Sequence, residues 1–179
     1  SFIKAVPSKD AIIANTPHQV AQWSPYADNG GTVLGLAGQG YAIIGGDTRL
    51  SDGGYSIQSR KTTKISKLTN HCVIGSSGQQ SERAMLWKSL QEACSDYEFT
   101  NDKEMSAHSL TQVLAITLYQ RRFFPIYTFN VVAGVDPETG RGNIYGYDAI
   151  GSFECADYCV TGTSSALVTS ILDNQAHFK

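Results

Sequence analysis

The sequence predicts an α+β domain in which helices are layered against sheet. Strand-like patterns occupy residues 32–76, two helical patterns follow at 81–97 and 106–118, strand patterns return at 126–147, and a last helical pattern covers 164–172. Runs of strands followed by runs of helices are typical of this class. A length of 179 residues, 41% of them hydrophobic, is enough for one such domain with a sizeable core.

The first strands are predicted to form a hairpin. Residues 32–37 and 41–47 are rich in aliphatic side chains, and Gly38-Gln39-Gly40 between them is typical of a turn. The run Ala42-Ile43-Ile44 is continuously apolar, which predicts a strand buried on both faces. Lys64-Ile65 and residues 72–76 predict further short strands.

Two amphipathic helices are predicted after these strands. In the first helix, at 81–97, one stripe holds Leu86, Leu90, Ala93, Cys94 and Tyr97. The second helix begins near Ser106, and its apolar stripe holds Leu110, Val113, Leu114, Thr117 and Leu118. Because the polar residues 98–104 read as a loop, we expect an antiparallel helix pair lying on the sheet.

The remaining part of the chain predicts a second hairpin and a third helix. Residues 126–135 are rich in β-branched and aromatic side chains, 136–140 have turn chemistry, and 141–147 return as a strand. Leu167, Ile171 and Leu172 lie at helical spacing within 164–172.

Composition argues against several classes of function. The formal net charge of -2 gives no basic surplus for nucleic acid, and no apolar run approaches the roughly 20 residues of a membrane helix. Cys72, Cys94, Cys155 and Cys159 lack paired metal-site spacing and the four histidines are scattered, so we expect reduced thiols, no metal site and no cofactor.

Two neighbouring motifs carry the chemistry. The first is the Asn-Gly-Gly-Thr-Val-Leu-Gly stretch at 29–35, and the second ends in Asp47-Thr48-Arg49 and is followed by Lys64. Together they resemble the β subunits of the 20S proteasome, in which a threonine opens the first strand and an Asp-Ser/Thr-Arg tripeptide and a lysine support it. The resemblance implies a four-layer αββα sandwich of two antiparallel sheets flanked by helices, the N-terminal nucleophile hydrolase fold.

The resemblance also implies that the nucleophile is missing. Thr32 matches the family's third position, which places Gly30 where active members carry the threonine. An N-terminal threonine attacks through its Oγ while its own α-amine accepts the proton, and a lysine and a carboxylate support the hydroxyl. Asp47 and Lys64 are therefore expected to remain as a structural ion pair, and the chain itself is expected to have no catalytic residue.

Three further residues match site positions of active relatives. The resemblance gives Gly78 the backbone N–H of an oxyanion hole, and gives Thr163 and Ser165 a role in positioning the threonine. Without a nucleophile, we expect Gly78 to be a plain turn residue. We expect the hydroxyls of Thr163 and Ser165 to cap the helix that begins at Ser164.

An active enzyme that uses Thr32 is the alternative hypothesis. Moving the nucleophile two positions along a strand shifts it by roughly 6.6 Å, at about 3.3 Å per residue, which exceeds the ~2.6–3.2 Å reach of a nucleophile and its base. The amine of Thr32 also lies within a peptide bond of the continuous chain. A third hypothesis, a stand-alone binding module, predicts a stable monomer.

The chain is expected to divide at residue 29. Residues 1–29 contain three prolines and predict an extended arm or retained leader, in which Trp23, Pro25 and Tyr26 form an apolar patch that packs on this chain or on a neighbour. Residues 30–179 match the β-type domain. The family would require a C-terminal helix and closing strands beyond the last residue given.

The resemblance finally implies an assembly. Segments at 24–32, 121–125, 147–153 and 172–175 are similar to a non-catalytic member of the family, and Arg121 to Pro125 read equally well as a strand entrance or a subunit contact. The expected partners are β subunits of the same and the opposite ring and the α subunits, within a particle of the cytoplasm and nucleus.

Overall fold

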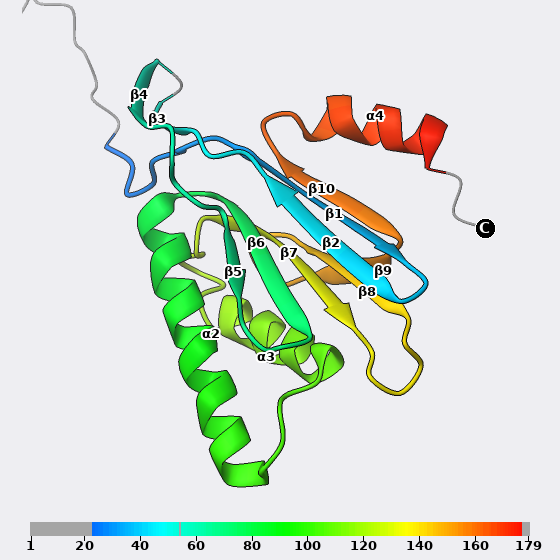
Figure 1. Cartoon of the computed structure of the whole chain (residues 1–179). Helices are drawn as coiled ribbons and strands as arrows, with labels where there is room; N and C mark the ends of the chain where they lie inside the picture. Colours follow the sequence, from blue (N-terminus) through cyan, green and yellow to red (C-terminus); the bar gives the residue numbers. More distant parts are fainter. Residues whose placement is uncertain (1–22, 54, 177–179) are drawn as a thin grey trace, which may run out of the picture.

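The computed structural model describes residues 23–53 and 55–176, in which two stacked sheets lie between helices (Figure 1). Helices α2 (Gln80–Asn101) and α3 (Ala107–Tyr119) cover the outer face of a five-stranded sheet. Helix α4 (Ser165–Gln175) lies on the outer face of a three-stranded sheet. The order helix, sheet, sheet, helix confirms the predicted four-layer sandwich.

The three-stranded sheet has the order β10-β1-β2, all antiparallel. Its strands are β1 (Thr32–Gly38), β2 (Tyr41–Gly46) and β10 (Tyr158–Gly162). Strands β1 and β2 form the predicted hairpin. The prediction that residues 42–44 are buried on both faces is wrong, because β2 is an edge strand and Ile43 is 53% exposed.

The five-stranded sheet has the order β5-β6-β7-β8-β9. Its strands are β5 (Ile65–Lys67), β6 (Cys72–Gly78), β7 (Thr128–Val135), β8 (Gly142–Tyr147) and β9 (Phe153–Ala156). The strand that is buried on both faces is β7, whose Val132 faces the helices while Val131 and Ala133 face the other sheet. A short hairpin of β3 (Leu50–Asp52) and β4 (Ser56–Ser59) stands apart from both sheets.

The helices begin and end where local polar groups satisfy their backbone. Helix α3 begins as predicted, with the Ser106 hydroxyl accepting the Ser109 N–H at 3.1 Å. Helix α2 runs four residues beyond the predicted end at Tyr97 and stops at Asp102, whose φ of 55° is left-handed. The expectation of a loop over 98–104 is therefore wrong for its first half.

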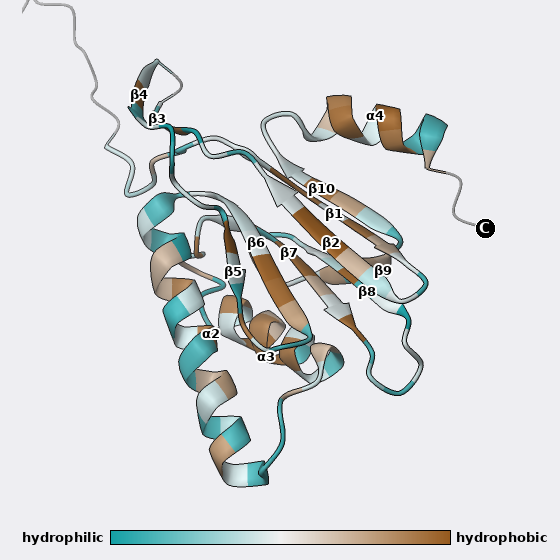
Figure 2. Cartoon of the chain, viewed as in Figure 1, coloured by the Kyte–Doolittle hydropathy of each residue, from teal (hydrophilic) through white to brown (hydrophobic). Residues whose placement is uncertain are grey.

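Two apolar clusters hold the layers together. One lies between α2, α3 and the five-stranded sheet and includes Leu90, Leu114 and Ile74. The other lies between the two sheets and includes Val33, Val131 and Ile144. Figure 2 shows the hydrophobic centres of β2, β6 and α3, while α2 alternates between hydrophilic and hydrophobic turns.

Residues 23–29 reach the domain without forming a helix or strand, and residues 1–22 of the expected arm lie outside the described residues. Tyr26 stacks on Phe124 with ring centroids 5.6 Å apart, and its hydroxyl donates to the Pro125 carbonyl at 2.7 Å. Trp23 is largely exposed. Of the predicted apolar patch, Tyr26 is the residue that packs on the domain.

Replacing Leu90 by Ala should destabilise the chain by about 2–5 kcal/mol, because it opens a cavity between α2 and the sheet. Met85→Ala is the matched control, since Met85 lies exposed on the same helix. Urea unfolding of both purified variants measures the difference. Equal losses of stability in the two variants would contradict the assigned core.

Candidate functional site

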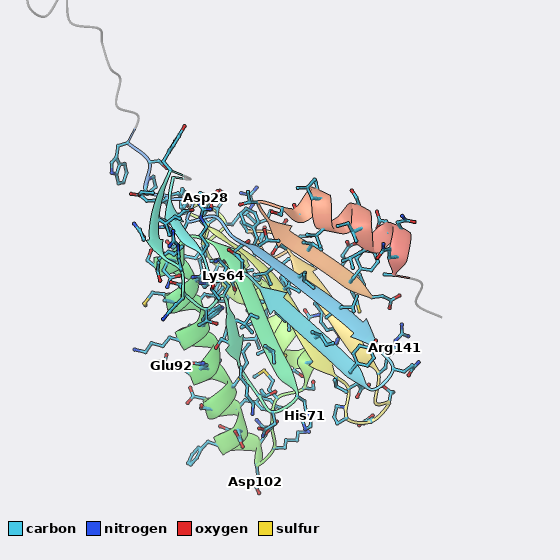
Figure 3. All side chains as sticks on the ribbon, turned by 45° about the horizontal axis from the view of Figure 1, so that its top comes forward. Asp28, Lys64, His71, Glu92, Asp102 and Arg141 are labelled. Carbon is cyan, nitrogen blue, oxygen red and sulfur yellow. The ribbon has the colours of Figure 1, made fainter. Side chains whose placement is uncertain are left out.

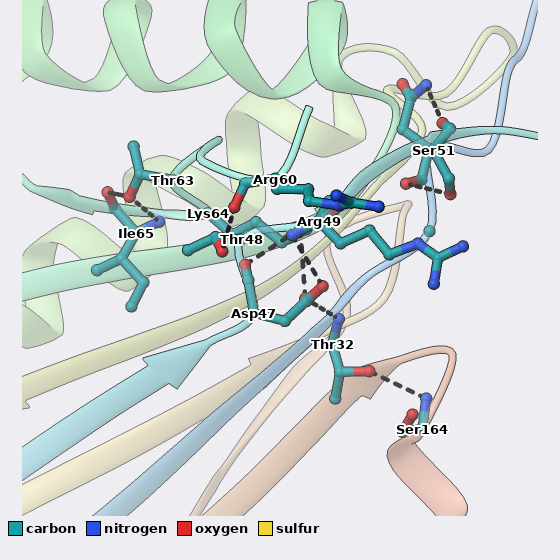
Figure 4. Close-up of polar contacts among 12 residues, drawn as sticks. Thr32, Asp47, Thr48, Arg49, Ser51, Arg60, Thr63, Lys64, Ile65 and Ser164 are labelled. Carbon is teal, nitrogen blue, oxygen red and sulfur yellow. Dashed lines mark hydrogen bonds and ion pairs between the residues drawn. The ribbon is translucent and has the colours of Figure 1, made fainter. Parts of the chain in front are cut away.

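The motif residues meet where β1 begins, β2 ends and α4 begins (Figure 4). In Figure 3, Asp28 lies near one end of the molecule, Asp102 lies at the other, at the end of α2, and Lys64 lies between them. Gly30 and Gly31 precede β1 with φ values of +67° and +90°, a left-handed conformation that L side chains rarely adopt. The Gly31 carbonyl accepts the Thr163 N–H at 3.0 Å, which joins this turn to the loop before α4.

Lys64 is the buried cation of the site. Its Nζ donates to the Asp47 carbonyl at 3.1 Å and to the Arg49 carbonyl at 2.5 Å, and it lies 3.3 Å from Asp47 Oδ1. Two of the three N–H donors of the ammonium are therefore used by backbone carbonyls, and the Asp47 carboxylate compensates its charge. Burial lowers the pKa of the Lys64 ammonium below its usual value, and the charge of Asp47 opposes that shift.

Asp47 joins Lys64 to β1. Its Oδ1 accepts the Thr32 N–H at 2.8 Å, and its Oδ2 accepts the Arg49 N–H at 3.3 Å. Burial raises the pKa of the Asp47 carboxyl, but these hydrogen bonds and the Lys64 charge outweigh burial and hold the pKa below its usual value. The expected ion pair between Asp47 and Lys64 is present.

The position that faces the Lys64 ammonium is Gly31. A Cβ added to Gly31 would lie 2.1 Å from Cε and 2.8 Å from Nζ of Lys64, whereas a Cβ on Gly30 would face Ser51 and Thr163. Gly31, and not Gly30 where the register predicted the missing nucleophile, therefore faces the lysine of the site. Counting back from Thr32 failed because both glycines leave the extended conformation before β1 begins.

Thr32 points away from this lysine. Its Oγ1 accepts the Ser164 N–H at 3.0 Å, at the first turn of α4, and its own N–H is donated to Asp47 (Figure 4). The hydroxyl that the alternative hypothesis requires therefore serves as an acceptor for the start of a helix. Both the backbone and the side chain of Thr32 therefore make structural hydrogen bonds.

The three other predicted site residues also lie around this turn. Gly78 is the last residue of β6, with φ of +103°, so the prediction of a plain turn is wrong. A Cβ there would lie 2.6 Å from the Tyr127 carbonyl oxygen, which explains the glycine. Thr163 and Ser165 line a cavity beside Gly30 and Gly31.

The prediction that side-chain hydroxyls cap α4 is also wrong. Ser164 is the N-cap residue and makes no side-chain capping hydrogen bond. The orphan N–H of Ser164 is instead satisfied by Thr32 Oγ1 from β1. Thr32, which is distant in sequence, therefore provides the capping hydroxyl that had been predicted from Thr163 and Ser165.

Asn29 is a structural residue of the site that sequence reasoning missed. Its buried side chain accepts the Gln80 N–H at 2.8 Å through Oδ1 and donates to the Ser51 carbonyl at 3.0 Å through Nδ2. It therefore caps α2, whose own N-cap Gln79 makes no such bond. Spacing along the chain carried no signal for this role, because the partners of Asn29 are distant from it in sequence.

A second buried cation lies behind β6. Arg83 Nη1 donates to the Ser76 carbonyl at 3.2 Å, and its guanidinium carbon lies 5.5 Å from the centre of the Trp87 ring. Burial lowers the pKa of Arg83, and the Asp47 charge opposes this shift. Helical spacing on α2 had not distinguished this arginine from the exposed charges of the same helix.

Two hollows flank the glycine turn. A cleft of about 810 Å³ includes Asp47, Arg49 and Val168 in its lining, and a second of about 500 Å³ includes Ser77, Phe129 and Thr163. Within residues 23–53 and 55–176, no group of three or more His, Cys, Asp or Glu side chains could hold a metal ion. In the same residues, no helix is long and apolar enough to span a bilayer.

Comparison with known proteins assigns these features to one family. A sequence model described as "Proteasome subunit" matches residues 27–179. A protein of Dictyostelium discoideum named "Proteasome subunit beta type-1" is 48% identical over 173 residues, which are 97% of this chain and 72% of that protein. Proteins of the same name from Arabidopsis thaliana and Danio rerio are 46% and 44% identical, over 88% of this chain and 70% and 66% of their own lengths.

Replacing Gly31 by Ala should destabilise the chain by more than about 1 kcal/mol, because the new methyl group overlaps the Lys64 side chain. Gly40→Ala is the matched control, because its φ of +82° carries a similar strain while nothing lies within 4 Å of the added Cβ. Thermal unfolding compares the two variants. A Gly31→Ala variant as stable as Gly40→Ala would contradict the packing of Lys64 at this position.

The Asp47 carboxylate should stabilise the fold above its unfolded-state pKa of 3.8 and lose that effect as the pH falls through its lower folded-state pKa. Wild type should therefore be more stable than Asp47→Asn at pH 6, and the difference should shrink below about pH 4. Unfolding midpoints from pH 2 to 7 measure this. Asp96→Asn, on the exposed face of α2, is the control. A stability difference that is independent of pH would contradict the ion pair's role.

Proposed function

The chain belongs to the proteasome subunit family, and we propose that it is a non-catalytic structural subunit at the sixth position of the 20S core particle's β ring. In this role it completes the ring and helps to enclose the chamber in which neighbouring threonine-protease subunits degrade proteins, including those marked by ubiquitin. The similarity to beta type-1 subunits over most of the chain supports this position.

The observation that carries the proposal is the pairing of Gly31 with Lys64. Nucleophilic catalysis in this fold needs a hydroxyl that a lysine ammonium can orient and a nearby amine that accepts its proton. Gly31 has no side chain, and the Lys64 ammonium donates to the carbonyls of residues 47 and 49 and pairs with the Asp47 carboxylate. The supporting groups therefore stabilise the loop after β2 instead of a nucleophile.

The backbone at Thr32 supports the same conclusion. A free α-amine at Thr32 would act as a base, but in this chain that nitrogen belongs to an amide whose N–H binds Asp47. The Thr32 hydroxyl is used by α4. The hypothesis of an active enzyme that uses Thr32 is not favoured, since both of its required groups have structural partners.

The proposed partners are the adjacent β subunits, the β subunits of the opposite ring and the α subunits. A chain whose site is structural contributes to the particle through its surfaces, so its substitutions should affect assembly before they affect peptide cleavage. A stand-alone binding module would instead persist as a small free species. Native mass spectrometry of the chain purified from its own cells separates these two outcomes.

A threonine-directed covalent inhibitor applied to the intact particle should label neighbouring subunits and leave this chain unmodified, because Gly31 offers no nucleophilic oxygen. Mass spectrometry of the separated subunits measures the adducts, and the labelled neighbours are the internal positive control. An inhibitor adduct on Thr32 of this chain would contradict the proposal.

A further inference from the structure

An apolar face lies at the C-terminal end of α3. Ile116 and Tyr119 on the helix are 58% and 63% exposed, and Phe123, four residues after Tyr119, is 99% exposed. Ile116 and Tyr119 are three residues apart and share one side of α3, and Phe123 lies in the turn that follows the helix. Clustered apolar residues on a surface mark an interaction site more often than single ones do.

The turn that presents Phe123 is held in place from both sides. The N–H groups of Arg121 and Arg122 donate to the carbonyls of Leu118 and Tyr119 at 3.1 and 3.0 Å. Phe124 then stacks on Tyr26, which comes from the segment before β1. The backbone that carries Phe123 therefore needs little further ordering when the turn contacts another protein, which favours binding.

A groove adjoins this face. It has a volume of about 490 Å³ and lies between the end of α3, with Ile116 and Tyr119, and the loop before β9, with Ile150 and Gly151. Gly151, with φ of +94°, allows the loop to pack closely against the helix. A Cβ at this position would lie only 2.5 Å from the Ala115 carbonyl oxygen. The groove is lined almost entirely by apolar or uncharged groups and can receive an apolar side chain.

The charge beside the groove is positive. Arg121 and Arg122 are exposed, and within residues 23–53 and 55–176 neither forms an ion pair. The acid of the loop before β9, Asp148, uses Oδ1 to accept the N–H groups of Ile150 and Ser152 at 3.0 and 2.8 Å. A complementary partner therefore presents carboxylates around an apolar side chain.

We propose that this α3-end surface, made of Ile116, Tyr119, Arg121, Arg122, Phe123 and Ile150, docks a different subunit of the core particle, which presents an apolar side chain flanked by carboxylates. This inference rests on the proposed function. A second copy of this chain fits less well, because a two-fold contact through this patch would set arginines against arginines. Aromatic residues and arginine are enriched at the centres of protein interfaces, which agrees with this composition.

Incorporation into the particle tests the proposal. Tagged wild type, Phe123→Ala and the double variant Arg121→Glu/Arg122→Glu are each expressed beside the untagged chain in its own cells, and the tagged fraction in the particle is measured by native gel. Both variants should enter about tenfold or more less efficiently than wild type, as truncation of an interface hot spot predicts. Phe99→Ala is the control, since Phe99 is 93% exposed at the end of α2, away from the surface, and should enter normally.

A photo-reactive phenylalanine analogue at position 123 identifies the partner. Its cross-link should fall on an acidic segment of another core-particle subunit, and the same analogue at position 99 should not reach that segment. If tagged wild type never enters a large particle, the proposed function fails. If wild type enters and both variants enter equally well, or the cross-link joins two copies of this chain, the docking inference alone is overturned.

Discussion

The rest of the site depends on how one buried ammonium group, that of Lys64, is bound. Lys64 donates to the carbonyls of residues 47 and 49 and pairs with the Asp47 carboxylate, and its side chain fills the space beside Gly31. A buried cation without these acceptors would destabilise the fold by several kcal/mol, on the order of 3–5. The lysine is therefore fixed as a structural group, and the chain beside it must remain glycine.

The loops around the site are joined to the Lys64–Asp47 pair by hydrogen bonds. Asp47 pairs with Lys64 and accepts the Thr32 N–H, Thr32 accepts the Ser164 N–H, and the Gly31 carbonyl accepts the Thr163 N–H. The same groups that could support a nucleophile thus join β1, β2 and α4 into one network. The presence of these supporting groups need not mean catalysis, because each of them has a structural partner here.

The helices and several strands could be predicted because periodicity reports burial, whereas the stacking of the four layers was implied only by the family resemblance. Burial on both faces was predicted for residues 42–44 but is found in β7. A continuously apolar run fits a central strand, and it equally fits an edge strand that leaves a side chain such as Ile43 exposed. Strands β9 and β10 escaped prediction because their residues are only partly buried. At the site, Asp47 and Lys64 were predicted, while Gly31 and the capping by Asn29 depend on contacts between distant segments and on left-handed φ values that spacing does not encode.

The most direct test of the central claim is the N-terminus of this chain in the purified particle, read by N-terminal sequencing. The account predicts a chain that continues through Gly30 and Gly31 into Thr32, so that the Thr32 nitrogen remains an amide donor to Asp47. A chain that begins at Thr32 with a free α-amine would supply both the hydroxyl and the base, and would contradict the account.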